Sequence, residues 1–80
     1  MATNQIKIIK GGVRIFTNDL VLTFSMDEYE SIVKQIKERK QELAMTFVHR
    51  KFSCPMVKAV GFINRVQVML MNPDQYVSVM

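Results

Sequence analysis

The sequence is poor in the residues that build disulfide scaffolds, metal sites and membrane spans. Its 80 residues include one cysteine and one histidine. The single Cys54 cannot form a disulfide within the chain, which excludes a disulfide-stabilised scaffold. No stretch approaches the roughly 20 consecutive apolar residues of a membrane-spanning helix, and the polar start MATNQ lacks the apolar core of a signal peptide. We therefore expect a cytoplasmic protein that does not enter a membrane.

Side chains that commonly carry out catalysis or bind metal are also few. His49 lies shortly before Cys54, which allows a thiolate–imidazole pair but equally suits two packed side chains. A structural zinc site needs about four ligands, and these two residues supply only part of such a set. The Gly11-Gly12 pair lacks the further glycines and the following helix of a phosphate-binding loop. We expect no enzymatic activity, no metal site and no cofactor.

The composition that is present is typical of a small globular domain. Apolar residues make up 49% of the chain and charged residues 22%, which argues against bulk disorder. A chain of this length buries a comparatively small fraction of its surface, so its core stabilises only modestly. We expect one domain over residues 1–80, and both a monomer and a homodimer are compatible with its size.

One amphipathic helix is predicted over residues 25–43. Ser25, followed three positions later by Glu28, forms a capping-box pattern, in which each side chain accepts a hydrogen bond from the other residue's backbone N–H. Apolar side chains then recur at helical spacing, and these are Tyr29, Ile32, Val33, Ile36 and Leu43. This apolar stripe requires a partner, and the segments rich in Val, Ile, Phe and Met on both sides of the helix are suited to provide it.

The segment before the helix predicts an antiparallel meander with strands over residues 5–9, 13–17 and 20–24. Gly11-Gly12 supplies the positive φ of a tight hairpin, and Asn18-Asp19 marks the second turn. Strand alternation assigns the side chains to two faces. The face toward the helix carries Ile6, Ile8, Val13, Ile15, Leu20, Leu22 and Phe24. The opposite face carries Lys7, Ile9, Arg14, Phe16, Val21 and Thr23.

The chain after the helix is harder to interpret. The absence of Gly and Pro before Ser53 allows the helix to continue, but the cluster Thr46-Phe47-Val48 favours a strand over residues 46–52. Residues 57–63 and 66–71 predict two more strands, and residues 76–79 a short edge strand. The complete prediction is an α+β fold in the order β-β-β-α-β-β-β, with roughly five to seven short antiparallel strands against a single helix.

The excess of positive charge lies outside the predicted helix. The net charge is +4, and residues 1–18 and 43–73 contain no acid, whereas residues 19–42 contain six acids and four bases. One helix covers only one face of a sheet, so bases and aromatics are expected on the other face. The predicted partner-binding residues there are Lys7, Arg14, Phe16, Lys58, Phe62 and Arg65. A second basic cluster is predicted in a loop and consists of His49, Arg50 and Lys51.

Three functions are compatible with such a basic and aromatic face. The first is recognition of another protein by a small accessory or inhibitor protein, because aromatics, Met and Arg are enriched in interface cores. The second is binding of single-stranded or duplex nucleic acid, with bases stacked on aromatics. The third is a sponge that holds an anionic nucleotide at an oligomer interface. The small size, the mixed apolar and basic face, and the missing catalytic residues favour the protein partner.

Overall fold

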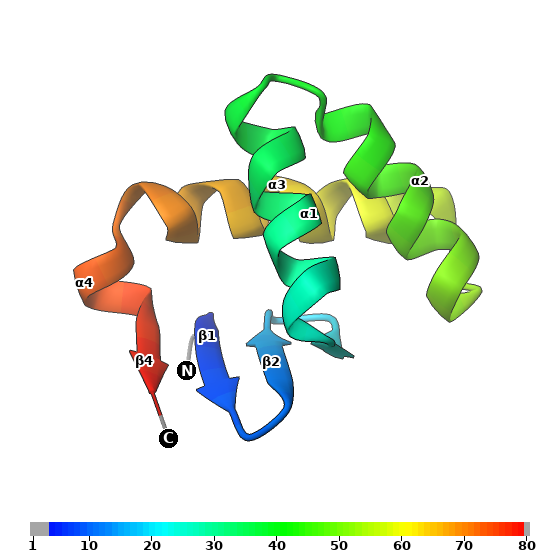
Figure 1. Cartoon of the computed structure of the whole chain (residues 1–80). Coiled ribbons are helices and arrows are strands. Elements are labelled where there is room, and N and C mark those ends of the chain that lie inside the picture. Colours follow the sequence, from blue (N-terminus) through cyan, green and yellow to red (C-terminus); the bar gives the residue numbers. More distant parts are fainter. Residues whose placement is uncertain (1–3, 80) are drawn as a thin grey trace.

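The structure, a computed structural model, describes residues 4–79 as a small sheet with a layer of helices (Figure 1). The elements are β1 (Gln5–Ile9), β2 (Gly12–Phe16), β3 (Val21–Phe24), α1 (Met26–Lys37), α2 (Gln41–Phe52), α3 (Met56–Met71), α4 (Pro73–Tyr76) and β4 (Val77–Val79). The expected α+β class is confirmed. The expected five to seven antiparallel strands around one helix are wrong, because residues 4–79 form four strands and four helices.

The sheet has the strand order β3-β2-β1-β4 and is mixed. The antiparallel pairs β1–β2 and β2–β3 confirm the predicted meander. Gly11 occupies the first hairpin with a φ of 83°, a conformation that glycine adopts without steric cost. After α4 the chain returns to place β4 beside β1, with Val77 opposite Ile6. The short edge strand expected near the end of the chain is therefore present, but it runs parallel to its neighbour rather than antiparallel.

The first helix begins where the capping box predicts and ends earlier than expected. Ser25 Oγ accepts a hydrogen bond from the Glu28 N–H at 3.1 Å, and Glu28 Oε1 accepts one from the Ser25 N–H at 2.9 Å. At the other end, Arg39 adopts a left-handed φ of 61°. The Lys40 N–H then donates to the Gln35 carbonyl at 2.7 Å, which is the bond of a Schellman C-cap. The single helix predicted over residues 25–43 is thus divided into α1 and α2.

The strands predicted over residues 46–52, 57–63 and 66–71 are wrong, because these residues form the end of α2 and nearly all of α3. Ser53 ends α2 with a left-handed φ of 54°, and Pro55 is the N-cap residue of α3. The buried side chains of α3 recur at helical spacing, and they are Ala59, Phe62, Ile63, Val66 and Met69. Burial of this stripe against the rest of the core outweighs the preference of its β-branched residues for strands.

The hydrophobic core lies between the helices and one face of the sheet. Of the expected inward positions, Ile6, Val13, Ile15, Leu22 and Phe24 are buried, and Ile8 and Leu20 are partly buried against the core. Phe24 is 1% exposed, and its ring centroid lies 5.3 Å from that of Phe52, 6.1 Å from Phe62 and 6.4 Å from Phe47. Phe24 of β3 therefore joins α2 and α3 to the sheet. None of the helices in the described part of the chain combines the length and apolar character needed to span a membrane.

Gly61 gives a first testable prediction. It lies at an exposed position within α3, and apart from its chain neighbours and the adjoining helix backbone no atom lies within 4 Å of the place where its Cβ would be. Because glycine within a helix costs about 0.5–1 kcal/mol relative to alanine, Gly61→Ala should raise the free energy of unfolding by about that amount. Urea denaturation measures it, and Gly61→Ser should give a smaller gain. A loss of stability in both variants would mean that this side of α3 is not open in solution.

Candidate functional site

The face of the sheet that the helices do not cover is called the open face here. Strand alternation and the pairing registers assign its residues, which lie between the buried positions of each strand. They are Gln5, Lys7, Ile9, Arg14, Phe16, Val21, Thr23 and Ser78. The expected positions of Lys7, Arg14 and Phe16 on the uncovered face therefore agree with the structure.

Most side chains of the open face form two neighbouring rows across the sheet. One row contains Lys7, Arg14 and Thr23, and the adjacent row contains Phe16 and Val21. Lys7 Nζ lies 5.5 Å from the centroid of the Phe16 ring, within the range of a cation–π contact. Arg14 Nε donates a hydrogen bond to Thr23 Oγ1 at 3.2 Å. The two cations are thus held on the sheet by neighbouring side chains, and apolar surface lies beside them.

The charge of the open face is positive and is not neutralised locally. None of its eight residues is acidic, and Lys10 lies in the adjoining β1–β2 turn. Within residues 4–79, the ion pairs are Lys40 with Glu38 and Lys51 with Glu28, so neither Lys7 nor Arg14 has a carboxylate partner there. A positive surface without internal counter-charges attracts an acidic ligand and steers its approach.

Three residues expected on this face lie elsewhere, because residues 57–71, predicted as two strands and the turn between them, are part of α3. Phe62 is 2% exposed and belongs to the core, so it cannot contact a partner on the open face. Lys58 and Arg65 are exposed on α3, where they line a small hollow of about 140 Å³ together with Asn18 and Asp19 of the β2–β3 turn. Lys58, Phe62 and Arg65 are therefore removed from the open-face site.

The cluster His49, Arg50 and Lys51 lies in the last turn of α2 and not in a loop. His49 Nδ1 donates to the Cys54 carbonyl at 2.6 Å, and Cys54 Sγ lies 3.8 Å from the Val48 carbonyl oxygen. These contacts with backbone carbonyls close the turn between α2 and α3. These contacts do not join the Cys54 thiol to the His49 ring, as the thiolate–imidazole pair considered from the sequence would require. Both side chains have a structural role at the turn.

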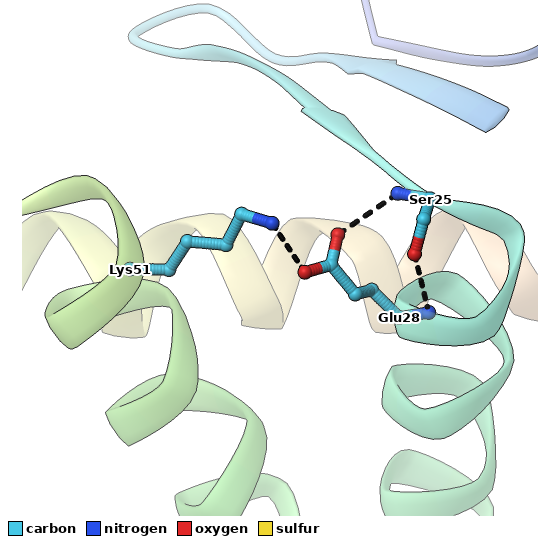
Figure 2. A network of polar contacts seen from close by, with 3 residues as sticks. All are labelled: Ser25, Glu28 and Lys51. Carbon is cyan, nitrogen blue, oxygen red and sulfur yellow. Dashed lines mark hydrogen bonds and ion pairs between the residues drawn. The ribbon is translucent and has the colours of Figure 1, made fainter.

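Lys51 connects α2 to the beginning of α1, as Figure 2 shows. Its Nζ donates to Glu28 Oε2, while the other Glu28 oxygen accepts the Ser25 N–H. The Lys51 hydrogen bond, followed by that of the Ser25 backbone, holds the pKa of the Glu28 carboxyl below its ordinary value. Lys51 Nζ also lies 5.7 Å from the centroid of the Phe52 ring. Lys51 is therefore engaged within the fold.

The lowered pKa of Glu28 predicts a specific pH dependence of stability. Because the folded pKa lies below the unfolded one, the carboxylate stabilises the fold at neutral pH and this contribution is lost as pH falls through the two values. Glu28→Gln should lower the free energy of unfolding near about pH 7, and its difference from wild type should shrink between about pH 6 and about pH 3. Urea denaturation across this range measures it. Lys51→Met should remove most of the pH dependence that Glu28 gives to the stability of the wild-type protein. If the free energies of unfolding of wild type and Glu28→Gln differ by the same amount at every pH, the role of the carboxylate charge is contradicted.

The structure also contains a hollow of about 580 Å³ between α1 and the corner where α3 meets α4. Tyr29, Val33, Leu70 and Val77 form much of its lining, and burial raises the pKa of the Tyr29 hydroxyl. Bases and acids both occur in the rim, which contains Lys34, Lys37, Glu30 and Glu38. Sequence reasoning missed this hollow because Tyr29 and Val33 have the spacing of core residues. Its mixed rim favours neither an anionic nor a cationic ligand.

Comparison of the chain with protein-family models, with curated proteins and with solved structures finds no match in any of the three. The described residues contain no group of three or more His, Cys, Asp and Glu side chains arranged to hold a metal ion. The open face and the hollow beside α1 are thus compared on their own geometry. Of the two, the open face has the more selective chemistry, since its charge has one sign.

Proposed function

We propose that the protein is a non-catalytic binding module whose open face recognises an acidic segment of a protein partner. The observation that carries this proposal is the pair of cations, Lys7 and Arg14, beside Phe16 on a face without a carboxylate. Carboxylates of the partner would replace the missing counter-charges, and charge-assisted hydrogen bonds to Arg14 are among the stronger polar contacts in proteins.

The apolar side chains of the open face favour a protein partner over nucleic acid. Proteins that bind single strands stack successive bases on several aromatic rings. The open face has one aromatic residue, Phe16, and the Lys7 ammonium lies over its ring. Ile9 on one side of the two cations, and Phe16 and Val21 on the other, provide apolar contact area. Apolar area beside an arginine is common in protein interfaces.

Peptide selection tests the proposal and does not require that the partner be identified first. A phage-displayed library of random peptides is selected against the immobilised protein, and the selected peptides are measured by fluorescence anisotropy over a salt series. We expect enrichment of Asp and Glu and an affinity that weakens as salt rises, because exposed charges are screened. Single-stranded and duplex oligonucleotides of mixed sequence serve as competing ligands. Selected peptides without acidic residues, or an oligonucleotide that binds more tightly than every selected peptide, would contradict the proposal.

A further inference from the structure

One edge of the sheet presents backbone groups that no neighbouring strand uses. β3 is the terminal strand of the order β3-β2-β1-β4, so residues 4–79 place no strand beyond it. The Thr17 N–H donates to the Leu20 carbonyl at 2.8 Å, and this pair begins the antiparallel ladder between β2 and β3. Because successive residues of such a ladder face opposite edges, Leu22 and Phe24 bond to β2. The backbone N–H and C=O groups of Val21 and Thr23 therefore point to the free edge.

Apart from its short length of four residues, this edge lacks the features that usually prevent the addition of another strand. Natural edge strands are protected by Lys, Pro, bulges or inward-pointing charges. β3 has the sequence VLTF and contains none of these residues. Val21 is 55% exposed, and both Val21 and Thr23 are β-branched residues, which are enriched in strands and pack well against a neighbouring strand. The backbone and the side chains of β3 are therefore both suited to pair with an extended segment.

Arg14 brings positive charge to the same edge. Its side chain leaves β2 and reaches across β3, where its Nε donates to Thr23 Oγ1. A residue paired with Thr23 from outside would place its side chain on the open face, beside this guanidinium. A carboxylate at that position could accept hydrogen bonds from the terminal amino groups of Arg14. An apolar side chain paired with Val21 would lie next to Val21 and close to Phe16.

We propose that the acidic segment of the partner binds as an added strand along β3, antiparallel to it. The segment places an acidic residue opposite Thr23 and, two residues later in its own chain, an apolar residue opposite Val21. Antiparallel addition is chosen because antiparallel pairing is slightly more stable per residue than parallel pairing. This inference rests on the proposed function, since it names the way in which the acidic segment is held on the open face.

Charge argues against a second copy of this chain as the occupant of the edge. Pairing of two β3 strands about a two-fold axis would place Val21 opposite Thr23 of the other copy. The strand contains no acid, so this arrangement offers no carboxylate to Arg14. It also brings the Arg14 residues of the two copies to one face of the joined sheet, where like charges repel. An acidic segment of another protein supplies both the backbone hydrogen bonds of a new strand to β3 and a carboxylate to Arg14.

The test combines a proline substitution in β3 with amide hydrogen exchange, using the tightest peptide from the library selection. Val21→Pro removes an outward N–H at the first residue of an edge strand, where proline is tolerated. We expect its affinity for the peptide to fall about tenfold or more, because a hydrogen bond to the added strand is lost and its acceptor is left unpaired. The control is Val21→Ile, which keeps the N–H and an apolar, β-branched side chain, so its affinity should fall much less than that of Val21→Pro.

Amide exchange in the wild-type protein tests the same inference without any variant. On addition of the peptide, the amides of Val21 and Thr23 should become protected, while the amide of Gly11, in the turn on the other side of β2, should not change. Retained affinity of Val21→Pro, with loss of affinity in a Lys7→Glu, Arg14→Glu variant, would overturn strand addition and leave the proposed function intact. If neither variant loses affinity for the peptide, both strand addition and the proposed function are overturned. Protection of Val21 and Thr23 that rises with protein concentration without peptide would assign the edge to a second copy and overturn the inference.

Discussion

Replacing Phe24 by alanine is expected to lower the free energy of unfolding by about 3–5 kcal/mol, the usual range for removal of a buried phenylalanine. Its ring is 1% exposed and contacts the rings of Phe47, Phe52 and Phe62. Alanine would remove these contacts and leave a cavity at the point where two helices meet the sheet. Small domains have a total stability of about 5–15 kcal/mol, so this loss is a large part of the whole.

Urea denaturation followed by circular dichroism measures this loss. Val21→Ala on the same strand is the matched control, and its effect should be much smaller because Val21 is 55% exposed. Phe24→Leu keeps most of the volume and should cost about 1.5 kcal/mol or less, which provides a folded variant if Phe24→Ala does not fold. A loss below about 1 kcal/mol for Phe24→Ala would contradict the central packing role of its ring.

Reversing the charge of both open-face cations is expected to have the largest effect on binding. The double variant Lys7→Glu, Arg14→Glu should weaken the selected acidic peptide by about a hundredfold or more, since attraction at two contacts becomes repulsion. Both side chains are on the solvent-facing side of the sheet, and Arg14 is exposed. The free energy of unfolding should therefore change little, which separates a loss of binding from a loss of fold.

A control variant separates local contacts from the total charge of the protein. Lys34→Glu, Lys37→Glu changes the net charge by the same amount on exposed positions of α1. Its affinity for the peptide should remain within a few-fold of wild type at an ionic strength of about 0.15 M, where exposed charges are screened beyond about 8 Å. Equal losses in the two double variants would mean that overall charge, and not the open face, determines binding.

The sequence correctly predicts those parts of the fold that are determined by local signals. Glycine at the first hairpin, alternation along the strands, and the pair Ser25 and Glu28 each act over a few residues. The end of α1 could not be predicted in this way. Arg39 and Ser53 adopt the left-handed conformation that glycine or asparagine usually adopts at the end of a helix. In these two places arginine and serine end the helix instead.

The prediction of strands in α3 failed for a different reason. Its four valines and one isoleucine have a strand preference, whereas the spacing of Ala59, Phe62, Ile63 and Val66 is helical. The helical period is therefore present in the sequence, and burial of this stripe in the core outweighs the strand preference of the valines. The same error moved Lys58, Phe62 and Arg65 onto the wrong surface, while Lys7, Arg14 and Phe16 were placed correctly because they belong to the meander.

The most direct test of the open-face proposal is chemical-shift mapping of the selected peptide on the isotope-labelled protein. We expect the largest changes at open-face residues of β1, β2 and β3, above all Lys7, Arg14 and Phe16. Changes concentrated at Tyr29, Val33 and Leu70, which line the hollow beside α1, would contradict it and would assign binding to that hollow instead.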